Sequence, residues 1–266
     1  MIVLALLLAY LLPFGDADPL GHLCGGVTGG DYTAQSTYGA NLELLPAALR
    51  KNASSGLFTK GSVGAAPHTV YGLGLCRGDA SACGDCIGAA FGDVQQLCPL
   101  NRDARALHEK CVLSYSSHDF ASYGSNATES LLVVVWPDDV KVKPMHPGNG
   151  ESVVSEMIDE IAMMAAYSLT TARYATGRVD VNSTGAPPAS IYSLAQCNQD
   201  LPPDDCRDCL DGIKKMFVGT YSSSSSVVSR QGAWVVGVWC NFRYGTHQFY
   251  QRQPMYMKSI GSSGVG

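Results

Sequence analysis

The chain has 266 residues, with 18 Lys and Arg against 23 Asp and Glu, and a formal net charge of -5 at pH 7. Because it is acidic and contains no run of basic residues, we do not expect nucleic acids or acidic membranes as its main partners. About 250 residues remain after a leader, which is enough for two domains that each bury their own core.

The N-terminus predicts a secretory signal peptide at residues 1–17. Residues 2–14 form an apolar run too short to span a bilayer comfortably, and small residues follow around a plausible cleavage site. An uncleaved anchor stays open as the alternative, because no basic residues precede the apolar run. No later segment is apolar enough to span a membrane, and three glycosylation sequons are present, at Asn52, Asn126 and Asn182. We therefore expect a secreted, extracellular glycoprotein without a membrane span after cleavage.

Hydrophobic periodicity predicts helices at about 41–54, 87–97, 152–171 and 210–217, the first with Pro46 in its interior. Strands are predicted at 70–75, 107–115, 131–136, 190–195 and 234–244. Residues 131–136 would close the first domain, and the prolines after them indicate a linker. The expected domains are 18–137 and 151–255, joined by a linker at 138–150 and followed by a flexible tail at 256–266.

The chain carries an internal duplication of roughly a hundred residues. Two sets of residues, each made of one cysteine and its neighbours, recur at matching positions in the two copies. Tyr71, Leu73, Cys76 and Asp79 recur as Tyr192, Leu194, Cys197 and Asp200, and Cys111, Tyr115, His118 and Phe120 recur as Cys240, Tyr244, His247 and Phe249.

The ten cysteines are divided into six in the first copy and four in the second. The two CxxC pairs are compatible with zinc half-sites or redox pairs, but even sets in an oxidising compartment normally form disulfides. The second copy lacks counterparts of both Cys24 and Cys98, which suggests that these two are partners, and Cys83 lies awkwardly close to Cys86 for a bond. We predict no metal and five disulfides: Cys24–Cys98, Cys76–Cys83, Cys86–Cys111, Cys197–Cys206 and Cys209–Cys240.

The spacing Cys197-x8-Cys206-x2-Cys209, duplicated and followed by Cys240-x3-Tyr244, resembles the ginkbilobin-homologous, or stress-antifungal, domain of plant cysteine-rich repeat secretory proteins. The resemblance covers nearly the whole mature chain, although the first copy has six residues between its second and third cysteines, not eight. It implies an α+β fold of two tandem modules, each an antiparallel sheet of about five strands packed with two helices. It also implies a plant apoplastic protein.

The same resemblance identifies one candidate ligand-binding residue. In the antifungal ginkgo-seed member, mannose is bound by an Asn, an Arg and a Glu, and the matching positions here are Gly25, Arg105 and Ser116. Only Arg105 is retained, with a solvated or ion-paired strand residue as the alternative interpretation. The second copy has Trp234 and Gly245 at the last two positions.

No catalytic motif accompanies the six histidines, so we expect neither enzymatic activity nor a cofactor. The repeated His118 and His247 predict a structural hydrogen-bonding role. Trp234 and Trp239, expected on opposite faces of one strand, predict core or inter-domain packing, with a sugar-stacking platform as the alternative.

Two functional hypotheses follow. The first is a secreted plant defence or stress protein that binds a glycan or a cell-surface partner and acts against fungi. The second is a protein-interaction module that serves as an apoplastic ligand or co-receptor for related receptor-like kinases, without sugar binding. An extracellular hydrolase or thiol oxidoreductase is the third and weakest interpretation.

Overall fold

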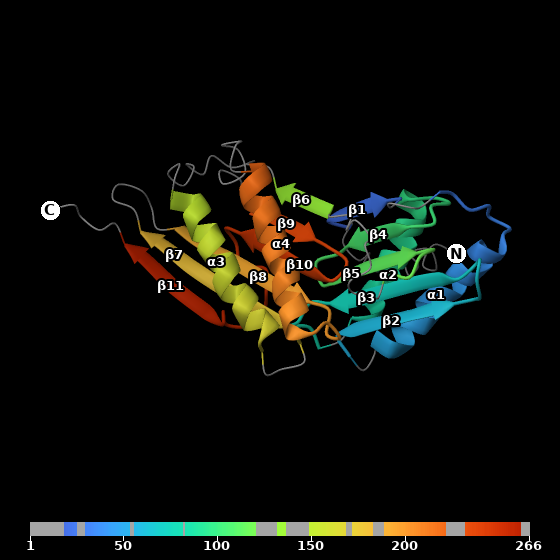
Figure 1. The fold of residues 1–266 in the computed structure, drawn as a ribbon, viewed down its shortest axis with the longest axis horizontal. Helices are drawn as coiled ribbons and strands as arrows, with labels where there is room; N and C mark the ends of the chain where they lie inside the picture. The colour runs from blue at the N-terminus through green and yellow to red at the C-terminus, as the bar shows by residue number, and fades with distance from the viewer. Residues whose placement is uncertain are drawn as a thin grey trace, which may run out of the picture.

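The computed structural model describes residues 19–25, 30–53, 56–81, 83–120, 132–136, 149–168, 172–182, 189–221 and 232–261 (Figure 1). These residues form two α+β modules that lie side by side along the long axis of the molecule. The predicted signal peptide and most of the predicted linker lie outside the described residues.

The first module is a five-stranded antiparallel sheet with two helices on one face. Its strand order is β1-β4-β5-β3-β2. The elements are β1 (Gly21–Cys24), α1 (Thr37–Ala53), β2 (Phe58–Val63), β3 (Val70–Cys76), α2 (Gly84–Leu97), β4 (Ala104–Leu107) and β5 (Cys111–Ser116).

The second module repeats this order and adds one strand. Its sheet runs β11-β7-β8-β10-β9-β6, antiparallel except for the β11–β7 pair. The elements are β6 (Leu132–Trp136), α3 (Asn149–Ala166), β7 (Tyr174–Asn182), β8 (Ala189–Cys197), α4 (Pro203–Tyr221), β9 (Gly232–Val236), β10 (Cys240–Gly245) and β11 (Tyr256–Gly261). Since β6 pairs with β9 as β1 pairs with β4, the two sheets are built alike.

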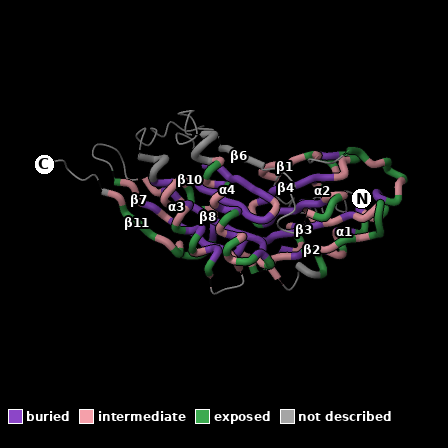
Figure 2. Tube along the Cα trace, viewed as in Figure 1, coloured by how far each residue is buried: buried purple, intermediate pink, exposed green. Residues whose placement is uncertain are grey.

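Each module has its own core between its helices and the inner face of its sheet, and Figure 2 shows the buried residues running along the strands of both sheets. In the first module, Tyr38, Leu42, Leu45 and Leu49 place one face of α1 in the core, each at most 1% exposed. This burial outweighs the backbone hydrogen bond that Pro46 removes from the middle of α1. The five predicted disulfide pairs are present, and most of their cysteines lie in these two cores.

The structure corrects four expectations. Residues 131–136 were expected to close the first module, but β6 belongs to the second sheet, where it takes the edge that β1 holds in the first. Residues 256–261 were expected in a flexible tail, yet they form β11, because Tyr256 and Ile260 pack on the second core and Lys258 pairs with Glu156. The edge strands β1 and β2 and the inner strand β7 were not predicted at all.

The last correction concerns the long strands expected at 107–115 and 234–244. Each is instead a hairpin of two strands, β4–β5 and β9–β10, with a short turn between them. The turns are closed by hydrogen bonds from His108 N to Cys111 O and from Gly237 N to Cys240 O, both 2.9 Å long. Trp234 and Trp239 therefore do not share a strand: Trp234 lies on β9 and Trp239 in the turn, where it is buried in the second core.

Candidate functional site at the junction of the modules

The two modules meet through the sheet faces that their helices leave uncovered. Leu107 and Val112 of the β4–β5 hairpin pack with Trp234 and Val236 of β9 in a separate hydrophobic cluster, and Leu20 packs against it. The four central side chains are at most 6% exposed. We call this contact, together with the polar residues described below, the junction. Its apolar centre makes the tandem a single packed unit.

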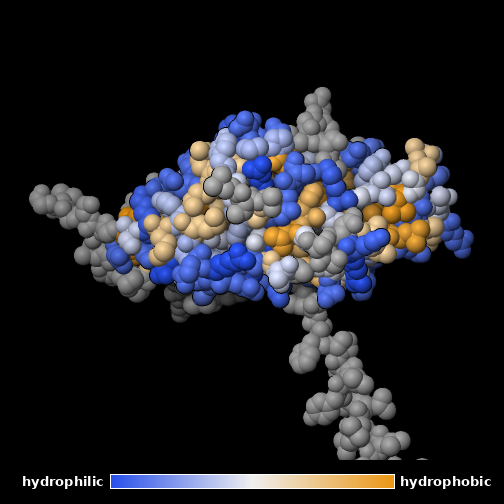
Figure 3. All heavy atoms as spheres, turned by 90° about the horizontal axis from the view of Figure 1, so that it is seen from below, coloured by the Kyte–Doolittle hydropathy of each residue, from blue (hydrophilic) through white to orange (hydrophobic). Residues whose placement is uncertain are grey.

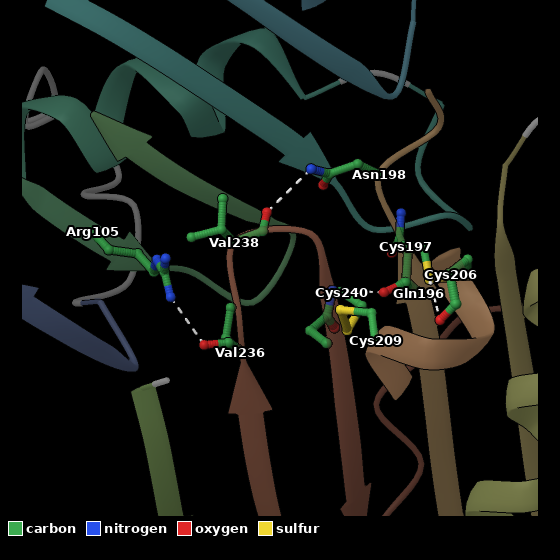
Figure 4. The surroundings of a disulfide bond; sticks show 10 residues. Arg105, Gln196, Cys197, Asn198, Cys206, Cys209, Val236, Val238 and Cys240 are labelled. Atoms are coloured by element: carbon green, nitrogen blue, oxygen red, sulfur yellow. Dashed lines mark hydrogen bonds between the residues drawn. A yellow bond between two sulfur atoms is a disulfide. The ribbon is translucent and has the colours of Figure 1, made fainter. Parts of the chain in front are cut away.

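Arg105, the candidate sugar contact, lies in the junction. Its Nε donates to Ser114 Oγ at 3.0 Å. Its Nη1 donates to Val236 O of the other module, also at 3.0 Å (Figure 4). The residue is only 5% exposed. The guanidinium is thus committed to protein contacts, because a buried arginine requires partners for its N–H groups.

A chain of ionic contacts crosses the junction at the β4–β5 turn. Arg77 Nε lies 2.6 Å from Asp79 Oδ1, and Glu109 Oε1 is contacted by both Arg77 Nη1 at 3.2 Å and Arg243 Nη1 of the second module at 2.8 Å. Burial lowers the pKa of Arg243, and its hydrogen bond with Glu109 opposes that shift. Arg243 also stacks on aromatic rings, its Cζ 4.0 Å from the centre of Phe249 and 5.2 Å from that of Trp234.

The duplicated aspartates each reach across the junction. Asp79 Oδ2 accepts a hydrogen bond of 2.6 Å from Gln251 N of the second module. Asp200, its counterpart in the second copy, pairs with Lys60 on β2 of the first module. The sequence marked both residues as repeated but gave no sign that they join the two copies.

Backbone groups complete the junction. Gln196 Nε2 donates to Cys76 O at 2.8 Å, and Gln196 Oε1 accepts from Gly78 N at 3.2 Å, so the one amide satisfies two buried groups of the other module. Gly78 packs directly on Tyr174, whose pKa is raised by burial. A Cβ at Gly78 would lie 2.2 Å from Tyr174 Cγ, which is far inside contact distance.

This close approach yields a prediction. We expect Gly78→Ala to lower the free energy of unfolding by about 2 kcal/mol, because the added methyl must displace a buried ring. Urea denaturation followed by circular dichroism measures the loss. Gly61→Ala on β2 is the matched control, because a Cβ there meets no atom within 4 Å. Equal losses in the two variants would contradict the close-packed junction.

The other two family sugar positions lie on either side of Asp103. Gly25 N donates to Asp103 O at 2.8 Å, and Ser116 Oγ donates to Asp103 Oδ1 at 2.6 Å. The hydroxyl of Ser116 is therefore satisfied within the protein. Sheet register identifies the counterparts that the sequence did not reveal: Val135 faces Ala233 as Cys24 faces Ala104, so Val135 and Trp136 take the places of Cys24 and Gly25.

The remaining sequence-selected residues are the repeated histidines and the sequons. His118 and His247 are exposed, and the Nδ1 of each lies about 3 Å from the hydroxyl of the preceding residue, at 3.1 Å from Ser117 Oγ and 3.2 Å from Thr246 Oγ1. Among the sequons, Asn182 is exposed at the end of β7, Asn52 lies near the end of α1, and Asn126 falls outside the described residues. Glycosylation at the three sites stays a prediction.

No group of three or more His, Cys, Asp or Glu suited to a metal ion occurs among the described residues. Within the same part of the chain, no helix has the length and apolar character needed to cross a membrane. Exposed large hydrophobic side chains are scattered over several elements, and on the face shown in Figure 3 they form patches broken by hydrophilic surface. Mixed apolar and polar surface of this kind is typical of surfaces that contact macromolecules.

Comparison with known proteins places these features in context. A family model described as salt stress response/antifungal matches residues 23–118 and 149–247. Cysteine-rich receptor-like protein kinase 6 of Oryza sativa subsp. japonica is 34% identical over 95% of this chain, which spans 36% of the kinase. Cysteine-rich repeat secretory protein 38 of Arabidopsis thaliana is 30% identical, with 86% of this chain and 84% of that protein covered.

A further relative is an antimicrobial ginkbilobin-2-like protein of Castanea crenata, 31% identical over 88% of this chain and 89% of that protein. Among solved structures, the tandem DUF26 ectodomain of the Arabidopsis thaliana cysteine-rich receptor-like protein PDLP5 matches with a TM-score of 0.62 and 21% identity. That match covers 87% of this chain and 100% of the ectodomain, and it shows that the tandem fold is the same.

Proposed function

The chain belongs to the salt stress response/antifungal family, and we propose that it acts as a recognition protein that binds a protein partner at the plant cell surface. It is a secreted, cysteine-rich protein of the extracellular space, related to the ectodomains of receptor-like kinases. Its two modules are of the non-enzymatic ectodomain type.

The position of Arg105 carries this proposal. Of the three positions that contact mannose in the ginkgo-seed member, Gly25 and Ser116 have lost the family residue, and Arg105 is held in the junction by Ser114 and Val236. The hydroxyl groups of a sugar at that site would need hydrogen-bond partners from the protein. Gly25 has no side chain, and the polar groups of Arg105 and Ser116 are bonded within the protein. Binding of a protein partner by the outer surface of the two packed modules needs no such sugar site.

The relatives suggest which partner to test. Receptor-like kinases match 95% of this chain with 36% and 38% of their own length, so this chain shares its tandem modules with such receptors. Ectodomains of related cysteine-rich receptor-like kinases are therefore the first partners to examine, with this chain as ligand or co-receptor.

The test is direct binding of the disulfide-intact protein to purified ectodomains of such kinases, measured by biolayer interferometry, alongside a glycan array. We expect saturable binding to at least one ectodomain and no binding to mannose-type glycans by either the wild type or Arg105→Ala. Mannose binding that disappears in Arg105→Ala, without binding to any ectodomain, would overturn the proposal in favour of a lectin. Protein that has been heat-denatured without reducing its disulfides is the control for nonspecific binding to the sensor and the array.

A second candidate is antifungal activity through a fungal wall glycan. It is favoured by the 31% identity with the antimicrobial ginkbilobin-2-like protein over 89% of that relative. Inhibition of hyphal growth by the folded protein, lost on unfolding, would support it. Normal growth together with no binding to isolated wall fractions would remove it.

A further inference from the structure

One disulfide differs from the other four in its access to solvent. All ten cysteines lie in the described part of the chain, and Cys24 is the one that is exposed. Its partner Cys98 is 1% exposed, Cys86 is half-buried, and the other seven are at most 8% exposed. Cys24 is therefore the cysteine most accessible to a thiolate in solution. The Cys86–Cys111 bond has one half-buried cysteine, and attack on the other three bonds requires the protein to open first.

The bond between Cys24 and Cys98 fastens a weakly held edge strand. It ties β1, a strand of four residues, to the residue that directly follows α2. Otherwise, among the described residues, β1 pairs with β4 alone, and each residue of β1 is half-exposed or exposed. Short edge strands of this kind have few contacts to resist fraying.

Strand β1 also covers part of the junction. Leu20, the residue before it, packs on the cluster of Leu107, Val112, Trp234 and Val236, and Leu20 N donates to Leu107 O at 2.7 Å. Departure of β1 would uncover this cluster and the free edge of β4. An uncovered strand edge is a site at which another polypeptide can pair.

We propose that Cys24–Cys98 is a redox-modification site, reduced selectively by an extracellular dithiol, and that its cleavage releases β1 from the edge of β4. One thiolate of the dithiol attacks Cys24 Sγ to form a mixed disulfide, and Cys98 leaves as a thiolate that takes up a proton. The second thiol of the dithiol then attacks the mixed disulfide and frees Cys24 as a thiol. The dithiol becomes a disulfide, and the protein gains two electrons and two protons.

The second module contains no equivalent of this site. Val135 takes the register position of Cys24, and the disulfides Cys197–Cys206 and Cys209–Cys240 both lie in the core. The reduction rate of the two disulfides in the second module therefore measures reduction that requires unfolding, and it serves as the internal reference for Cys24–Cys98. The inference stands independently of which partner the protein binds.

The first experiment follows reduction of the native full chain by dithiothreitol, with differential alkylation and peptide mass spectrometry. We expect Cys24 and Cys98 to be labelled at least about tenfold faster than the six cysteines of the three fully buried bonds, since these must wait for opening of the fold, and faster than Cys86 and Cys111. Equal rates, or earlier labelling of Cys209 and Cys240, would overturn the proposal.

The second experiment measures hydrogen exchange of peptides that contain β4, before and after the selective reduction. Faster exchange in β4 with unchanged exchange in β8 is the expected result. The double variant Cys24→Ser/Cys98→Ser should show the fast β4 exchange without reductant and no further response to it. Unchanged β4 exchange after reduction of this one bond would show that β1 stays in place, which would contradict the release.

Discussion

Replacing Trp234 with alanine is expected to lower the free energy of unfolding by about 4 kcal/mol, one of the two largest effects that the junction predicts. The indole is 5% exposed between Leu107, Val112 and Val236, and its Nε1 donates to Asn241 Oδ1 at 3.1 Å. Truncation removes this buried surface, leaves a cavity and strips a ring from beside Arg243. Urea denaturation followed by far-ultraviolet circular dichroism measures the loss.

Calorimetry separates damage at the junction from general destabilisation. In the wild type we expect the two modules to unfold in one transition, because they share the junction cluster. Trp234→Ala should divide this into two transitions, whereas Trp234→Phe, which keeps a ring in the cluster, should retain one. A single sharp transition in Trp234→Ala, with a loss below about 1 kcal/mol, would contradict a junction that stabilises both modules.

Asp79→Ala is expected to cost about 3 kcal/mol. The carboxylate is fully buried, lies 2.6 Å from Arg77 Nε and accepts a hydrogen bond from Gln251 N. Its removal leaves the Arg77 guanidinium, 8% exposed, with Glu109 as its remaining ionic partner, and leaves the Gln251 amide without its acceptor. Urea denaturation at pH 7 provides the measurement.

The duplicated residue Asp200 supplies the matched control for Asp79. Its ion pair with Lys60 is partly exposed, with 37% and 46% of the two side chains accessible, so solvent screening reduces its contribution. We expect Asp200→Ala to cost less than about 1 kcal/mol. If both variants lost the same free energy of unfolding, burial of the Asp79–Arg77 pair would not be the reason for the larger loss expected in Asp79→Ala.

The duplicated cysteine pattern explains why so much of the fold was accessible from the sequence. The joint absence of Cys24 and Cys98 counterparts from the second copy identified these two as partners, and the pair is present in the structure. Helical periodicity located all four helices, although α4 begins at Pro203, seven residues before the predicted start. Proline at the first helical position followed by Asp204 and Asp205 is an N-terminal signal that would have placed it correctly.

Beyond the packing of Trp234 between the modules, which agrees with the inter-domain packing expected for it, the junction was not predictable, because local sequence carries no record of contacts between the outer faces of two sheets. Arg105 reaches Val236, and Gln196 reaches Cys76, across more than a hundred residues of chain. The strands β1 and β2 were missed for a related reason. Each is short, contains a glycine and pairs on one side, so neither has the alternating apolar pattern of a half-buried strand.

The duplicated residues Asp79 and Asp200 each touch the opposite copy, as equivalent residues do in an isologous contact, although their partners, Gln251 and Lys60, are not equivalent. Between separate polypeptides, such an assembly would dissociate on dilution. Here one chain carries both halves in fixed proportion, so the second half is present at a high effective concentration whatever the amount of protein outside the cell. The paired surface can therefore persist in a dilute extracellular fluid where a dimer of single modules would come apart.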